Sequence, residues 1–564
     1  MRIAETSDLW WKNAVIYCLD PETFFDDDGD GSGDFGGLIQ RVDYLAALGV
    51  TCIWLMPFYP SPDRDDGYDV TDMYGVDRRL GTLGDVVEFI RTAKDRGMRV
   101  IADFVINHTS DKHPWFVQAR KSVDNPYRDY YVWRKDTPPD TSDQVVFPGE
   151  ETSIWTQDKA SGEWYLHMFA KHQPDLNVMN PKVRDEIAKA MGFWLQLGLD
   201  GFRLDAVPFF LELRGEPKDA AARIDPHSYL GALRSFLGRR SGSAVLLGEV
   251  NLPYKDQLKY FGGPEGNELN MQFDFLSMQY MYLALAREDA RPLATSLGSR
   301  PKIHPDNQWA MFVRNHDELT LDKLSDSERD EVFAAFGPDK DMQMYGRGLR
   351  RRLPTMLNGD PARIRMVYSL MFSLPGTPAL FYGEEIGMGE NLTAKGRSAV
   401  RTPMQWDDAE NGGFSTAAAK DLVAPVVEGY FGPKNINAAA AKRDPESLWN
   451  FIATLIQRYR ESPELGWGEF ELIKHPAAKV LLHRCSRAGS TLVLAHNFGA
   501  EPASVAANAA SAGDPGEHFA GAVLRDLLDG EDVPLAEDGS FELELGRYGY
   551  RWFRIQRPTD RRMP

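Results

Sequence analysis

Polar residues that can do chemistry stand at the ends of short apolar segments in this sequence. Four carboxylates, two histidines and an arginine occupy such places. They are Asp103 and His108, Arg203 and Asp205, Glu249, and His316 with Asp317. A lone aspartate there often caps the helix that follows. A whole set at successive segment ends instead indicates one shared site.

These residue types fit retaining cleavage of a glycosidic bond. That reaction uses one carboxylate as nucleophile and one protonated carboxyl as acid, roughly 5–5.5 Å apart. Arg203 precedes Asp205 by two residues, so on a strand both side chains point to the same face. The neighbouring guanidinium would keep Asp205 ionised, as a nucleophile requires. Glu249 lies in an apolar context, and desolvation would raise its pKa as a general acid requires. Asp317 would hold sugar hydroxyls.

A metal-dependent barrel hydrolase is the alternative enzyme class, because Asp and His at strand ends also bind zinc. Such sites usually cluster their histidines, often as His-x-His on the first strand. The first segment here ends Cys18-Leu-Asp-Pro21 and has no histidine, and none of the 11 histidines forms a His-x-His pair. The sequence therefore disfavours a zinc hydrolase.

The apolar segments predict the elements that must position these residues. Several segments are continuously apolar, which is typical of strands buried on both faces, and helical patterns such as Leu83–Arg96 lie between them. The segments are Asn13–Asp20, Gly49–Phe58, Met98–Asn107, Gly198–Val207, Ser243–Val250, Leu269–Phe275, Gln308–Asp317 and Thr377–Gly387. Eight strands alternating with helices predict an α/β fold, a (β/α)₈ TIM barrel whose active site lies at the carboxyl ends of the strands.

Two further regions interrupt or follow this alternation. About 90 residues separate the third and fourth segments, where a simple βα unit needs roughly 30. We therefore predict a barrel at 1–107 and 181–465 with an inserted domain at 108–180. Alternating patterns after residue 466 predict a C-terminal antiparallel β-sandwich at 466–564, with a surface loop at Asn497–Gly516. We interpret the arginine-rich run Arg347–Leu353 as the charged face of a helix.

Composition excludes several classes of function. The 564 residues include 64 Lys+Arg against 83 Asp+Glu, a net charge of −19 that repels phosphate backbones and anionic lipid. We therefore expect no nucleic-acid partner and no membrane. The start of the chain does not resemble a signal peptide, and Cys18, Cys52 and Cys485 are expected to be buried thiols rather than disulfides. These features predict a cytoplasmic protein, and a homo-oligomer stays possible.

The motifs at the segment ends resemble the four sequence regions of the α-amylase superfamily (glycoside hydrolase family thirteen). They are Asp103-Phe-Val-Ile-Asn-His108, Gly201-Phe-Arg-Leu-Asp-Ala-Val207, Glu249, and Arg314-Asn-His-Asp317. The resemblance implies a small oligosaccharide substrate, with Asp205 as nucleophile, Glu249 as acid/base and Asp317 as transition-state stabiliser. The substrate-binding residues that it implies are Asp65, Tyr68, Asp103, Asn107, His108, Arg203, His316 and Arg401. It implies no organic cofactor.

Within the superfamily, Gln173-Pro-Asp-Leu-Asn177 and Arg401-Thr-Pro-Met-Gln-Trp406 are similar to the trehalose synthases. This resemblance implies isomerisation of maltose to trehalose with some hydrolysis. An α-glucosidase that releases glucose from maltose-type or sucrose-type substrates is the alternative. A catalytically dead sugar-binding module would be expected to lack a catalytic carboxylate, and all three are present. Glu22 departs from the pattern, because relatives carry an arginine there.

The acidic loop Asp26–Asp34 has five carboxylates in nine residues, with glycines that allow tight turns. Such a loop suits an all-oxygen Ca²⁺ site. It is not an EF-hand, because the twelfth position counted from Asp26 is Gly37. Its resemblance to the calcium loop of α-glucosidase-type relatives implies one structural Ca²⁺ held by Asp26, Asp28, Asp30, Asp34 and the carbonyl of Ser32. The alternative is a solvated acidic turn.

Overall fold

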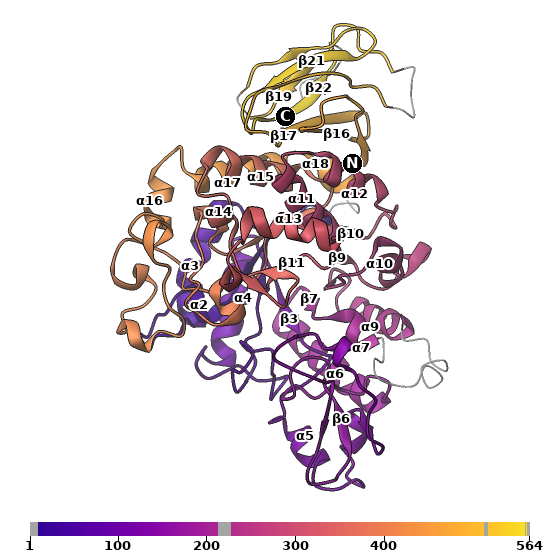
Figure 1. Ribbon diagram of the computed structural model, residues 1–564, viewed down its shortest axis with the longest axis vertical. Coiled ribbons are helices and arrows are strands. Elements are labelled where there is room, and N and C mark those ends of the chain that lie inside the picture. The colour runs from indigo at the N-terminus through magenta and orange to yellow at the C-terminus, as the bar shows by residue number, and fades with distance from the viewer. Residues whose placement is uncertain (1–8, 212–226, 512–516, 529, 559, 561–564) are drawn as a thin grey trace.

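The computed structural model describes residues 9–211, 227–511, 517–528, 530–558 and 560, and its centre is a closed barrel of eight parallel strands (Figure 1). The strands are β1 (Ile16–Leu19), β2 (Cys52–Leu55), β3 (Arg99–Phe104), β7 (Gly201–Leu204), β8 (Val245–Gly248), β9 (Met271–Phe273), β10 (Gln308–Phe312) and β14 (Thr377–Phe381). They follow one another in chain order, and β14 pairs with β1 to close the barrel. Each strand lies within one of the predicted segments, so the TIM-barrel prediction is confirmed.

Helices surround the barrel and return the chain to the start of the next strand. The main ones are α3 (Phe35–Leu48), α4 (Leu83–Asp95), α6 (Pro181–Leu197), α9 (His227–Arg240), α11 (Phe275–Arg287), α12 (Arg291–Ser299), α13 (Asp326–Phe336), α15 (Pro361–Ser373) and α17 (Leu448–Arg460). Thr82 and Asp85 form a capping box that starts α4, and Gly198 ends α6 at a φ of 116°, where glycine is favoured. In the described part of the chain, no helix is long and apolar enough to cross a membrane.

The chain between β3 and α6 leaves the barrel and forms a small lobe of its own (Figure 1). It contains α5 (Pro114–Ala119) and a three-stranded antiparallel sheet in the order β4-β6-β5. The strands are β4 (Trp133–Arg134), β5 (Trp155–Gln157) and β6 (Trp164–Leu166). A separate apolar cluster that includes Ile154 and Met168 stabilises the lobe. Because β3 pairs directly with β7, the barrel closes without it.

The C-terminal strands form two antiparallel sheets that share one apolar core. The larger sheet contains β15 (Glu469–Leu472), β16 (Val480–Arg487), β17 (Ser490–Asn497), β19 (Val523–Asp526), β20 (Val533–Pro534) and β22 (Tyr550–Gln556). The smaller pairs β18 (Ala503–Asn508) with β21 (Ser540–Leu545). The predicted β-sandwich is confirmed, but the predicted loop at Asn497–Gly516 is wrong where β18 forms, because tertiary pairing with β21 outweighs the weak strand propensity of alanine. Residues 512–516 lie outside the described residues.

A small sheet follows β10 at the mouth of the barrel. Its strands are β11 (Leu319–Thr320), β12 (Gln343–Met344) and β13 (Gly348–Leu349), in the order β11-β13-β12. The arginine-rich run therefore begins in a hairpin, and its prediction as a charged helix face is wrong. Buried Arg352 donates to the carbonyls of Tyr382 and Val400, and Arg351 pairs with Glu390. These arginines hold loops together rather than facing water.

Candidate active site

Arg203, on β7, lies at the centre of the carboxylates at the strand ends. Its Nη1 donates to Asp103 at 2.5 Å and to Asp205 at 2.6 Å, and its Nη2 donates to Glu249 at 2.7 Å. The side chain of Arg203 is 1% exposed. Three carboxylates from β3 and from the ends of β7 and β8 therefore share one buried guanidinium. Asp205 and Glu249 bind its two terminal nitrogens, which brings these carboxyl groups close together.

The two carboxyl groups differ in acidity. Burial raises the pKa of Glu249 to about 7, with Arg203 opposing this shift and the charges of Asp205 and Asp317 adding to it. Burial raises the pKa of Asp205 to about 6, again against the effect of Arg203. Asp205 therefore loses its proton before Glu249 does. The pair suits an ionised nucleophile beside a protonated acid.

The backbone after Asp205 helps to hold Glu249 in place. Ala206 adopts a left-handed φ of 48°, which is uncommon for a residue other than glycine. Its amide donates to Glu249 Oε2 at 3.2 Å. The turn that ends β7 thus fixes the acid candidate on the neighbouring strand end.

Asp317, after β10, is surrounded by positive charge. Arg397 Nη1 lies 2.9 Å and Arg401 Nη2 3.0 Å from its Oδ1. Although burial opposes ionisation, the two guanidiniums hold the pKa of Asp317 well below its ordinary value. Asp317 is therefore a permanent negative charge at the mouth of the barrel.

Aromatic residues form the floor of the site. The Tyr68 hydroxyl lies 2.6 Å from His316 Nε2 and 3.1 Å from Asp103 Oδ2, and the Tyr68 and His316 rings are stacked. Trp54 donates to Asp103 through Nε1 at 2.9 Å. These hydrogen bonds connect Tyr68, His316, Trp54 and Asp103 and hold the floor in one arrangement.

One end of the site is closed by Asp65, Gln173 and His108. Gln173 Nε2 donates to Asp65 Oδ2 at 2.7 Å and lies 3.2 Å from His108 Nε2. The Phe169 ring packs against His108. Burial lowers the pKa of His108 to about 3, so its ring is neutral at physiological pH. A wall of polar groups beside an aromatic face is typical of a subsite for a single sugar ring.

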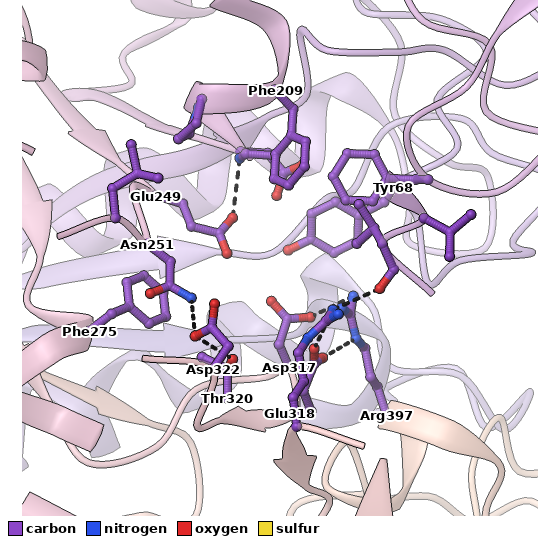
Figure 2. Close-up of a pocket in the computed structure, with 18 of the residues that line it drawn as sticks. Tyr68, Phe209, Glu249, Asn251, Phe275, Asp317, Glu318, Thr320, Asp322 and Arg397 are labelled. Atoms are coloured by element: carbon purple, nitrogen blue, oxygen red, sulfur yellow. Dashed lines mark hydrogen bonds and ion pairs between the residues drawn. The ribbon is translucent and has the colours of Figure 1, made fainter. Parts of the chain in front are cut away.

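The opposite end is formed by residues that follow β8 and β10. Asn251 Nδ2 donates to Asp322 Oδ1 at 2.9 Å, and Thr320 Oγ1 donates to the same oxygen at 3.2 Å. Figure 2 shows Asn251, Phe275 and Asp322 on one side of the cavity, with Tyr68 and Arg397 on the other. Glu249 lines the same cavity and lies above Asn251 in this view.

A wall beside the cavity joins two segments that are far apart in the sequence. Arg347, from the β12–β13 hairpin, donates to the carbonyl of Val146 in the inserted lobe at 2.8 Å. Phe147 stacks on Tyr345 with ring centroids 5.2 Å apart. Arg347 also lies 3.4 Å from Glu318. We call the contacts of Val146, Phe147, Tyr345 and Arg347 the side wall.

The cavity enclosed by these groups has a volume of about 460 Å³, within the roughly 300–1,000 Å³ usual for small-molecule sites. Of the predicted site residues, those that line it are Asp65, Tyr68, His108, Asp205, Glu249 and Asp317. The others lie behind this lining: Asp103, Asn107, Arg203, His316 and Arg401. Asn107 does not line the cavity, and its side-chain amide donates to buried Asp175.

The structure adds residues that the sequence analysis missed. They are Phe169, Phe209, Asn251, Phe275, Glu318, Asp322, Lys323, Arg347 and Arg397. Arg397 stands four residues before Arg401 and donates through Nε to Glu318 at 2.8 Å. The nearness of Arg397 to the Arg401 motif in the sequence could have indicated that it belongs to the site. Of the others, Phe209 lies on α7 (Val207–Leu211), Phe275 begins α11, and most of the rest lie in loops at the barrel mouth.

Glu22, which departs from the family pattern, lies on the short helix α2 (Pro21–Phe24) beside this site. It pairs with Arg79, which also binds Asp63 and Asp77. Burial raises the pKa of Glu22 to about 9, with the charges of neighbouring aspartates adding to the shift. The arginine expected at position 22 is thus replaced by a carboxyl group that takes its positive partner from another loop.

The acidic loop brings three of its predicted ligands together. Single carboxylate oxygens of Asp26, Asp28 and Asp34 lie within 4.8 Å of one another. Asp30 lies outside this group and accepts the Ser32 amide at 2.8 Å. Asp34 also begins α3 by accepting the Gly37 amide at 2.7 Å. Three converging carboxylates are a donor set that fits a hard cation such as Ca²⁺.

Comparison with known proteins agrees with this architecture. Residues 16–332 and 349–468 match the family model of the alpha amylase catalytic domain, and residues 489–554 match that of the sucrose hydrolase-like C-terminal domain. The chain is 37% identical to a trehalose synthase of Pimelobacter sp. (strain R48), with all of both chains covered.

Two further similarities are lower in sequence identity. An oligo-1,6-glucosidase of Halalkalibacterium halodurans is 32% identical, over 87% of this chain and 91% of its own. Among solved structures, the trehalulose synthase of Pseudomonas mesoacidophila MX-45 superposes with a TM-score of 0.76 at 29% identity, covering 97% of this chain and 99% of its own.

Proposed function

This chain belongs to the α-amylase family, and we propose that it is a retaining α-glucosyl-transferring enzyme that isomerises maltose to trehalose with some hydrolysis. The observation that carries the proposal is the guanidinium shared by Asp205 and Glu249. It brings the two carboxyl groups into the close arrangement that retaining enzymes need. Full-length similarity to a trehalose synthase supports the choice of reaction.

The geometry gives each carboxylate a role in two displacements. Glu249 protonates the leaving oxygen while Asp205 attacks the anomeric carbon and forms a glucosyl ester. Glu249 then takes a proton from the incoming acceptor, which attacks the ester and releases Asp205. Asp317, held ionised by Arg397 and Arg401, stabilises positive charge on the flattened sugar ring.

The closed end supports action on a terminal glucosyl unit. Asp65 and His108 line this end of the cavity, and Gln173 fixes the Asp65 carboxylate by donating to it at 2.7 Å. The non-reducing glucosyl unit binds at this end, and the second sugar binds near Asn251 and Asp322. A short α-glucoside such as maltose fills both ends.

The side wall supports transfer to glucose rather than to water. Released glucose has to stay in the cavity and turn before it attacks the ester at a different hydroxyl. The contacts of Arg347 with Val146 and of Phe147 with Tyr345 enclose that side of the cavity. An α-glucosidase, the alternative reaction, needs no such retention.

Proton NMR of the purified protein with maltose, and separately with trehalose, tests the reaction. We expect trehalose to form from maltose with little free glucose, and maltose to form from trehalose. Glucose alone, released first as the α-anomer, would establish a retaining α-glucosidase instead. An unchanged spectrum with both sugars would contradict action on either disaccharide and direct the search to sucrose.

The side wall makes a direct prediction for Arg347→Ala. Loss of its hydrogen bond to Val146, worth about 0.5–1.5 kcal/mol, should raise the ratio of glucose to trehalose formed from maltose by roughly two- to tenfold. Arg91→Ala removes an exposed arginine of α4 and serves as the matched control. An unchanged product ratio in Arg347→Ala would show that the side wall does not retain glucose.

We also propose that Asp26, Asp28 and Asp34 hold one structural Ca²⁺. The cation would offset repulsion between the carboxylates and tie the loop after α2 to the start of α3. At Ca²⁺ concentrations near 100 times Kd, binding adds about 2.7 kcal/mol to the free energy of unfolding. We expect the Tm to fall after chelation, to recover with Ca²⁺, and to be insensitive to Ca²⁺ in Asp28→Ala. If the Tm of the wild type does not change with Ca²⁺, the loop is a solvated acidic turn rather than a Ca²⁺ site.

A further inference from the structure

Lys323 is a charged residue at the second-sugar end of the cavity to which the mechanism above assigns no role. It lines the cavity together with Asn251, Phe275 and Asp322. Its Nζ lies 2.6 Å from Asp322 Oδ2, and 22% of its side chain is exposed. An ammonium has three donors, and the described contacts use one of them.

Asp322 has little capacity left to bind a sugar itself. Its Oδ2 accepts Lys323, and its Oδ1 accepts Asn251 at 2.9 Å, Gln279 at 3.2 Å and Thr320 at 3.2 Å. An ionised carboxylate offers about four acceptor positions, two on each oxygen, so Oδ1 is fully used and Oδ2 keeps about one. Asp322 therefore acts as an anchor for the groups around it.

The anchored groups are the ones that can meet the second sugar. Asn251 donates one of its two amide hydrogens to Asp322, and its Oδ1 is buried without a partner. The backbone amide of Lys323 donates to Gln279 Oε1 at 2.8 Å, which fixes the start of its side chain. The second-sugar end thus presents the remaining donors of Lys323 beside Asn251, which also lines the cavity.

We propose that Lys323 is a specificity-determining residue that donates to a hydroxyl of the second sugar and, through Asp322, keeps Asn251 in its binding orientation. The proposal deepens the proposed function and rests on the assignment of the two ends of the cavity. Although burial opposes ionisation of Asp322, Lys323 lowers its pKa. The pair therefore keeps its charge and its geometry when the cavity is dry.

Two substrates isolate this role. Maltose occupies both ends of the cavity, whereas α-glucosyl fluoride occupies only the closed end. We expect Lys323→Met to lower the ratio of kcat/KM for maltose to kcat/KM for the fluoride by about tenfold, the scale of one hydrogen bond to a charged group. Lys189→Met, which removes an exposed paired lysine of α6, should leave the ratio at the wild-type value.

The pH dependence separates this role from a merely structural one. Without the ammonium, burial raises the pKa of Asp322, so the ratio in Lys323→Met should fall further between pH 7 and pH 5 than it does in the wild type. A ratio within twofold of wild type at both pH values would overturn the proposal. Absence of trehalose among the wild-type products would overturn the isomerase assignment instead, and the ratio would still report on Lys323.

Discussion

Replacing Asp205 by asparagine is expected to abolish turnover of maltose, with a loss in kcat of roughly 10⁴-fold or more, the scale of losing a residue at the centre of covalent catalysis. The amide cannot form the glucosyl ester. Its oxygen can still accept from Arg203, which binds Asp205 at 2.6 Å. The variant should therefore fold normally. Steady-state kinetics with maltose and with α-glucosyl fluoride provide the measurement.

The intermediate itself can be trapped. A slow glucosyl fluoride analogue should label the wild-type protein once, and peptide mass spectrometry should find the sugar on Asp205. Asp72→Asn changes an exposed aspartate outside the cavity and should label and turn over like the wild type. Near-normal activity in a correctly folded Asp205→Asn variant, or a label on another residue, would contradict the assignment of the nucleophile.

The barrel could be predicted because its strands are short runs buried on both faces. Segments such as Val100–Phe104 have no polar alternation, and polar residues follow several of the strands where they reach the mouth, as Asp205 follows β7 and Glu249 follows β8. Arg203 and Asp205 share a face through the two-residue period of a strand, and they do meet at one site. The geometry of the catalytic centre follows from this local rule together with the closure of the barrel.

The second-sugar end could not be predicted in the same way. The contact of Asn251 with Asp322 joins loops 71 residues apart, and that of Arg347 with Val146 spans 201 residues. No periodic pattern in the sequence indicates either contact, because each depends on where two loops meet at the mouth of the barrel. The arginine-rich run was misread for a related reason: buried carbonyl acceptors such as that of Val400 satisfy Arg352, and a sequence does not display them.

Glu249→Gln should reduce activity in a way that depends on the leaving group. Turnover of maltose should fall by roughly 10²- to 10⁴-fold, the usual contribution of general acid–base catalysis. The first displacement with α-glucosyl fluoride should be far less affected, because fluoride leaves without protonation. Azide needs no general base, so it should restore turnover of the fluoride and give α-glucosyl azide, with net retention.

The pH profile provides the second part of this prediction. In the wild type, activity should fall as pH drops below about 6, because Asp205 gains a proton, and as pH rises above about 7, because Glu249 loses one. In Glu249→Gln with fluoride and azide, the alkaline limb should disappear while the acidic limb remains. Glu265→Gln, an exposed matched control, should keep both limbs. Equal losses on maltose and fluoride without azide rescue would mean that Glu249 serves only to hold Arg203. The combination of a lost alkaline limb and anionic rescue can arise only if Glu249 carries the proton, because a positioning role would affect both substrates at every pH.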